Sequence, residues 1–163
     1  SRLDCHLGHG RLVRGDGVIN RSVRCLIWPQ PSQRTCIEFG AFVSGFPLER
    51  RFGYDRGFET YDDVLPHGND PRRAPYVERP ADQTTSRAVR WLDGHAGEGA
   101  PWFLWVHYFD PHSPYEPPHE YAARFATHPY DGEIAFVDAQ LGVLLARIET
   151  LGLAGRTVVV VTA

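Results

Sequence analysis

The chain has 163 residues, enough for one domain, and 42% of them are hydrophobic and 12% aromatic. These fractions indicate a globular chain with a core and not a disordered one. The formal net charge of −3 gives no support for nucleic-acid binding. No apolar run approaches the roughly 20 residues that a membrane helix needs. We therefore expect no nucleic-acid partner and no membrane-spanning segment in this sequence.

Residues 1–38 show neither a helical nor a strand period. We expect this segment to be disordered or altered by a frame disruption, and we place the domain itself at residues 39–163. Cys5, Cys25 and Cys36 all lie in this first segment, and their spacings match no zinc or redox motif. We interpret them as incidental thiols.

From Phe39 onward, strand and helix patterns alternate along the chain. The apolar run at residues 39–44 predicts a buried strand, and residues 48–63 and 62–79 are rich in polar residues, glycine and proline and predict loops. An amphipathic pattern at residues 80–95 predicts a helix, residues 102–108 predict a second strand, and residues 119–127 predict a short helix. Alternation of this kind is typical of an α/β fold.

The clearest element is a helix at residues 130–151. Its apolar residues recur at spacings of three and four: Ile134, Val137, Leu141, Leu144, Ile148 and Leu151. The apolar run at residues 157–162 then predicts a strand buried on both faces of a parallel sheet. We expect it to lie parallel to the strand at 102–108, with the long helix packed across one face of the sheet.

One histidine is placed where parallel α/β proteins bind their ligands. The strand at 102–108 runs into a loop in which Pro111 and Pro114 flank His112. Proline fixes its own φ and restricts the residue before it, so the loop is stiff. Ligand sites in such sheets lie beyond the carboxyl ends of the strands. His112 is therefore a candidate site residue, although the same pattern also occurs in plain surface turns.

Other polar residues carry weaker signals. The histidines that suit a metal by type have irregular spacing: His107, His112, His119 and His128. A histidine-only zinc site is accordingly a weak hypothesis, and we interpret His107 as a buried strand residue. The long helix carries Asp131, Glu133 and Asp138. Asp131 suits the helix start, where the macrodipole favours negative charge. Asp138 borders the apolar stripe and needs a hydrogen-bond partner there.

Four blocks of the sequence, taken in order, resemble the sulfatase family of the alkaline-phosphatase superfamily. They are GAFVSGFPLERRFGYDRGFETYDD, VERPADQTTSRAVRWLD, WFLWVHYFDPHSPYEPP and YDGEIAFVDAQLGVLLARIETLGLAGRTVVVVTA. Together they fall within residues 39–163, about three quarters of the chain. The match is specific because all four occur in the family's order.

The resemblance implies a partial alkaline-phosphatase-like sandwich, an α/β fold with a largely parallel sheet that is truncated at both ends. It implies hydrolysis of a sulfuric ester of a glycan or other small molecule. The alternatives are a phosphate or phosphonate ester hydrolase on the same scaffold, or a catalytically dead fragment. By the resemblance, His112 is both catalytic and substrate-binding: it faces the ester, hydrogen-bonds the sulfate and can protonate the leaving oxygen.

The resemblance also implies a divalent cation, with calcium expected, and a nucleophile that is a Cys- or Ser-derived formylglycine, a Thr or a Ser. The family's cation ligands and its nucleophile motif are not matched by any residue of this chain, so no metal ligand is assigned. Cys5, Cys25 and Cys36 lack the flanking Pro-x-Arg of that motif. We therefore expect the 163-residue chain itself to be inactive and to bind calcium only weakly.

Overall fold

The structure is a computed structural model that describes residues 37–66, 78–95 and 100–163. The expectations for residues 1–36 and for the three cysteines lie outside the described residues. The elements in chain order are β1 (Glu38–Val43), the 3₁₀ turns η1 (Phe46–Leu48) and η2 (Arg50–Phe52), β2 (Thr60–Asp62), α1 (Ala81–His95), β3 (Trp102–His107), α2 (His119–Arg124), α3 (Pro129–Thr150) and the 3₁₀ turn η3 (Ala154–Arg156).

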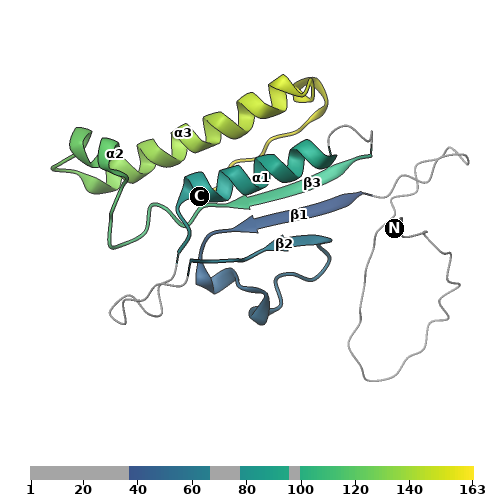
Figure 1. The fold of residues 1–163 in the computed structure, drawn as a ribbon, viewed down its shortest axis with the longest axis horizontal. Helices are drawn as coiled ribbons and strands as arrows, with labels where there is room; N and C mark the ends of the chain where they lie inside the picture. Colours follow the sequence, from purple (N-terminus) through teal and green to yellow (C-terminus); the bar gives the residue numbers. More distant parts are fainter. Residues whose placement is uncertain (1–36, 67–77, 96–99) are drawn as a thin grey trace, which may run out of the picture.

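The three strands form a parallel sheet in the order β2-β1-β3 (Figure 1). β1 pairs with β3 along its whole length, from Glu38 opposite Trp102 to Val43 opposite His107. The shorter β2 pairs with the second half of β1, with Ala41 opposite Tyr61. All three strands consequently end at the same edge of the sheet, and the α/β class predicted from the sequence is confirmed.

One face of the sheet is covered by α1 and the end of α3. Phe42 packs there against Ala88, Trp91 and Leu92 of α1, and Ile148 of α3 joins the same cluster. The contact is close enough that a Cβ at Gly40 would lie 2.7 Å from Cε2 of Trp91. A glycine in β1 thus lets the indole ring approach the backbone of the strand.

The opposite face is covered by the segment between β1 and β2. Ala41, Val43 and Tyr61 are buried there, with Leu48, Phe58 and Trp105 packed against them. The Tyr61 hydroxyl donates to the Leu48 carbonyl at 2.6 Å, which ties η1 to β2. Burial raises the pKa of Tyr61 to about 12. The described sheet therefore has helices on one side and an ordered loop on the other.

Most of the predicted elements are present within a few residues of their expected bounds. The exception within residues 48–63, which were expected to be a loop, is β2. Three residues are too few to show an alternating pattern, so the strand is defined only by its pairing with β1. In the part of the chain that the structure describes, no helix is long and apolar enough to cross a membrane.

The strand expected at residues 157–162 is not found, and this prediction is wrong. The backbone of this segment pairs with no described strand, and Val158 and Val160 are 89% and 81% exposed. The segment lies across an open cavity of about 710 Å³ from β3, with Trp102, Leu104 and Val160 among its lining residues. A run of valines favours extended backbone, but a strand forms only where a partner's N–H and C=O groups are within hydrogen-bonding distance.

The buried face of α3 also differs from the predicted stripe. Leu144 and Ile148 are buried as expected, but Ile134 is 43% exposed, whereas Glu133 and Phe136 are buried. α3 packs mainly along α1 and α2 and reaches the sheet only through its last turns. The first half of the helix therefore turns a different set of residues inward, including one carboxylate.

A buried arginine joins four segments at the edge where the strands end. The Arg79 side chain is fully buried, and it donates to Asp62 Oδ1 at 2.6 Å, to the Val43 carbonyl at 2.8 Å and to Thr84 Oγ1 at 3.0 Å. Arg87 pairs with the other oxygen of Asp62 at 2.9 Å. Burial alone would raise the pKa of Asp62, but these two arginines outweigh it and lower that pKa.

We expect Arg79→Met to lower the free energy of unfolding by about 3 kcal/mol. This is the lower end of the range for a broken buried ion pair, because Arg87 still neutralises Asp62. Urea unfolding measures the change. Arg90→Met, at an exposed position of α1, is the matched control and should stay within about 0.5 kcal/mol. A loss below about 1 kcal/mol for Arg79→Met would show that this arginine does not join the segments.

Candidate functional site

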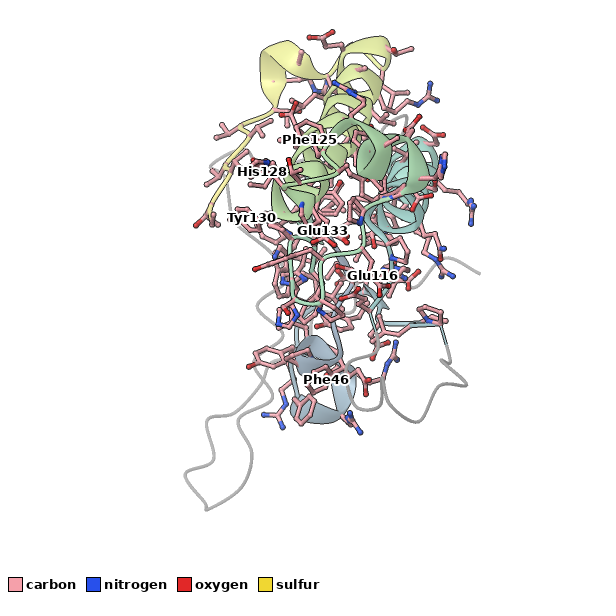
Figure 2. The ribbon with its side chains drawn as sticks, turned by 90° about the vertical axis from the view of Figure 1, so that its left-hand side faces the viewer. Phe46, Glu116, Phe125, His128, Tyr130 and Glu133 are labelled. Carbon is pink, nitrogen blue, oxygen red and sulfur yellow. The ribbon has the colours of Figure 1, made fainter. Side chains whose placement is uncertain are left out.

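The candidate site lies at the edge where the three strands end. Figure 2 faces this edge, with Glu133 and Glu116 near its centre, Tyr130 and His128 above them and Phe46 below. The loop that leaves β3 carries His112 here, five residues beyond the last residue of the strand. Its Asp110–Pro111 and Ser113–Pro114 peptide bonds are cis. The sequence-based placement of His112 at the carboxyl end of a parallel strand is thus correct.

The end of β1 holds the start of this loop. The Ser44 hydroxyl donates to the His107 carbonyl at 2.8 Å and accepts from the Phe109 N–H at 2.5 Å. Ser44 is fully buried, so its hydroxyl bridges the two backbone groups away from water. The next residue is Gly45, where a Cβ would overlap the Phe109 ring. Absence of a side chain at Gly45 is what allows the ring to lie on the backbone.

Phe109 in turn supports the imidazole. The Phe109 and His112 rings stack with their centroids 4.2 Å apart and an angle of 26° between their planes. His112 Nδ1 lies 2.8 Å from the Ser113 carbonyl, which can only accept a hydrogen bond. Nδ1 therefore carries a hydrogen, and the proton that the ring gains or loses is on Nε2. The residue is exposed, so a molecule in solution can reach it.

A buried carboxylate on α3 holds the rest of the loop. Glu133 is 2% exposed, and its two oxygens accept backbone N–H groups from His112 at 3.2 Å and from Glu116 at 2.6 Å. Each carboxylate oxygen of Glu133 thus accepts one backbone N–H of the loop. Hydrogen bonds to a charged group contribute about 1.5–3 kcal/mol each, so this contact is substantial.

Two acidic residues near the loop have raised pKa values. Burial raises the pKa of Asp110, against the opposing effect of hydrogen bonds from its own N–H and from that of Ala81. Burial likewise raises the pKa of Glu133, the Glu116 N–H lowers it, and the charge of Asp110 raises it further. Oδ2 of Asp110 is buried without a hydrogen-bond partner among the described residues. The base of the loop is therefore a partly dehydrated acidic region.

The other histidines have different environments. Burial lowers the pKa of His107, whose Nδ1 has no hydrogen-bond partner among the described residues, in agreement with the interpretation of a buried strand histidine. His119 begins α2 and is exposed, and His128 precedes α3 and contacts the Thr127 hydroxyl at 2.9 Å. None of these three joins His112 in a common ligand set.

The described residues do not fit the divalent cation implied by the family. Among residues 37–66, 78–95 and 100–163, no group of three or more His, Cys, Asp or Glu side chains is placed to hold a metal. Asp131 and Asp138 are exposed on α3, and Glu133 already accepts two backbone N–H groups. The partner expected for Asp138 is not needed, because its carboxylate is in water.

The sequence predicts the position of His112 beyond β3 but does not indicate the residues that hold its loop. Ser44 and Gly45 ended a predicted strand and had no assigned role, and Glu133 was only one of three acids on a helix. The sequence places Gly132 beside Glu133, but the effect of this glycine is seen only in the structure, where a Cβ at Gly132 would lie 3.0 Å from Cγ of Pro117. This small residue lets the proline-rich loop come close to α3, but the proximity depends on tertiary packing.

The whole described arrangement can be compared with known proteins. The Sulfatase family matches residues 28–163, which is most of the chain. The chain belongs to the sulfatase family. The match begins at residue 28, ahead of Gly40, the first residue of the GAFVSG segment. No curated protein matches this sulfatase chain in sequence.

Two solved structures are similar to part of this chain. The crystal structure of Ps i-CgsB has a TM-score of 0.50 at 18% identity and covers 82% of this chain and 36% of its own. The crystal structure of Ps i-CgsB in complex with k-i-k-neocarrahexaose has a TM-score of 0.49 at 19% identity and covers 71% and 34%. The sulfatase chain thus spans about a third of the length of these solved chains. The first likeness supports the alkaline-phosphatase-like α/β fold.

We expect Gly45→Ala to destabilise the protein by about 1–3 kcal/mol, because the new methyl group overlaps the Phe109 ring. The backbone at Gly45 has φ −124°, which alanine adopts without strain, so the loss reports the overlap alone. Gly94→Ala is the matched control: nothing lies within 4 Å of its Cβ position in α1, and it should stabilise by about 0.5–1 kcal/mol. Urea unfolding of both variants checks the pair, and a neutral Gly45→Ala would contradict the close approach.

We expect isothermal titration calorimetry of the 163-residue chain with calcium chloride to give no micromolar dissociation constant. Calcium takes six to eight oxygen ligands, and the described residues present no such cluster. Micromolar binding with a defined stoichiometry would overturn this reading of the acidic residues on α3.

Proposed function

We propose that this chain provides the proton-donating part of a sulfuric ester hydrolase, with His112 as the catalytic and substrate-binding histidine. The observation that carries the proposal is the environment of the ring. His112 is exposed at the carboxyl edge of a parallel sheet, stacked on Phe109, with Nδ1 bonded to a carbonyl. The proton that can move is therefore on Nε2, and the imidazole is held in one orientation.

The proposed step is protonation of the leaving oxygen. As the nucleophile of the proposed whole enzyme forms its bond to sulfur, the S–O bond to the alcohol breaks, and both electrons of that bond go to the departing oxygen. The imidazolium of His112 gives its Nε2 proton to that oxygen, the alcohol leaves neutral, and the ring becomes a neutral imidazole. Before the bond breaks, the same N–H can donate to a sulfate oxygen, which is the proposed substrate-binding role. A positioned acid of this kind contributes typically ~10²- to 10⁴-fold.

The proposed substrate is a sulfate ester of a glycan or of another small molecule. Two tyrosines near the histidine support an open site that accepts a sizeable alcohol. Tyr115 and Tyr130 are 41% and 44% exposed, and their rings meet edge to face with centroids 5.2 Å apart. Exposed aromatic faces of this kind suit contact with the apolar faces of a ring-shaped ligand.

In this proposal the nucleophile and the divalent cation, with calcium expected, belong to the whole enzyme. They are not assigned to any described residue of this chain. The family match supports hydrolase chemistry in general. The described residues offer no ligand cluster for the cation, so no step is assigned through it. Within the proposal, the 163-residue chain is inactive by itself, since nucleophile, cation and acid act as a unit.

The test uses the protein expressed from its complete coding sequence, with aryl sulfates of different leaving-group basicity. We expect His112→Ala to lower kcat/KM by about 10²- to 10⁴-fold for a basic alkoxide or phenoxide leaving group. The loss should be much smaller for a nitrophenolate, which leaves without needing a proton. Steady-state kinetics across such a series measures the difference.

His119→Ala is the matched control, because His119 is an exposed histidine outside the loop. It should leave every substrate of the series unaffected. An equal loss for all leaving groups in His112→Ala, or no loss at all, would reject His112 as the proton donor. Phosphate monoesters cleaved faster than sulfate esters by the unmodified enzyme would reject the sulfuric ester as substrate.

A further inference from the structure

The loop that carries His112 has few backbone groups with which to hold itself in place. Pro111, Pro114, Pro117 and Pro118 have no N–H. His112 lies between Pro111 and Pro114, and Glu116 lies between Pro114 and Pro117. The N–H groups of these two residues both bond to one side chain, the carboxylate of Glu133. One residue of α3 therefore takes a donor from each side of the second cis peptide bond.

This arrangement is not the usual one for an acid in the first turns of a helix. A carboxylate at that position commonly bonds to the N–H groups of its own helix or lies in water near the positive end of the macrodipole. Asp131, two residues earlier, is exposed in this way. Glu133 instead faces inward, is 2% exposed, and directs both oxygens to a different segment of the chain.

Burying a carboxylate costs desolvation free energy. If the loop only had to be held in place, an apolar side chain at this position would do so without that cost. Hydrogen bonds, unlike apolar contacts, fix the direction of the groups that they join. The Glu133 bond to the N–H of His112 therefore fixes the backbone from which the imidazole extends. From the side of β1, the Phe109 ring stacks on the imidazole, and Ser44 holds the backbone N–H of Phe109.

We propose that Glu133 is a positioning residue, which sets the place and orientation of His112 by clamping the backbone of residues 112–116. The role in catalysis rests on the proposed function of His112; the clamp itself does not. Glu133 lies too deep in the protein to be offered as a substrate contact, and it acts only through the loop.

The first experiment tests the clamp without any activity measurement. Hydrogen–deuterium exchange of the protein from its complete coding sequence is followed in a peptide that spans residues 109–118. We expect Glu133→Ala to speed exchange in this peptide about tenfold or more, because two amides lose their acceptor. Peptides from β3 and α1 should be unchanged. Unchanged exchange at residues 109–118 would overturn the proposal, whatever the enzyme assay shows.

Two further variants keep the result interpretable if Glu133→Ala folds poorly. Glu133→Gln keeps one acceptor oxygen of nearly the same shape and replaces the other by an amide, so it should give an intermediate rate of exchange. Asp138→Ala, an exposed acid on the same helix, is the control and should behave as the unmodified protein. Equal exchange in Asp138→Ala and Glu133→Gln would argue against the clamp.

The second experiment tests the positioning role by a double-mutant cycle. We expect Glu133→Ala to lower kcat more than it raises KM, and to do so most for the substrates with the most basic leaving groups. In the His112→Ala background the same change should have almost no further effect. A loss that is independent of the leaving group, or that multiplies with the loss of His112→Ala, would make Glu133 merely structural. If His112→Ala itself has no effect while the exchange result holds, the proposed function fails and the clamp stands.

Discussion

The parallel pairing of β1 with β3 is the constraint on which the described site depends. Six residues of each strand face one another, so Val43 and His107 end the two strands side by side. Because of this register, the Ser44 hydroxyl can bridge the His107 carbonyl and the Phe109 N–H. A shift by one residue would turn Ser44 to the other face and leave those groups without the bridge. The position of His112 is thus set first by a backbone ladder and only then by side chains.

A second constraint comes from the burial of carboxylate side chains. Asp62, Asp110 and Glu133 lie where the strands end, and two kinds of donor hold them: arginine side chains and backbone N–H groups. Two arginines neutralise Asp62 and lower its pKa in spite of burial. Asp110 and Glu133 accept from backbone N–H groups, and burial raises both pKa values. The charge of Asp82 adds to the rise for Asp110, and the charge of Asp110 adds to the rise for Glu133. The backbone N–H groups favour the ionised carboxylates, but they do not outweigh the effect of burial on the two pKa values.

The same elements show what the sequence could predict. Residues with strong local patterns were placed correctly: the helix α1, the strand β3 and the proline-flanked His112 all follow from periodicity and from the stereochemistry of proline. The failures arise where a neighbour decides the outcome. β2 exists because β1 offers it a ladder, and residues 157–162 form no strand because nothing described pairs with them, although their valines favour one. Glu133 could not be singled out, because its role depends on a loop that precedes it by 17 to 21 residues in the chain.

The two histidines of this region show how environment separates similar side chains. His107 ends β3, burial lowers its pKa and so favours the neutral ring, and its Nδ1 is buried without a hydrogen-bond partner among the described residues. His112 lies five residues later, exposed, with one nitrogen fixed on a carbonyl and its ring supported by Phe109. Only the second arrangement combines access with a defined direction for a proton. That combination requires a loop that extends beyond the sheet and is nevertheless held rigidly, which is what the prolines, Ser44 and Glu133 together provide.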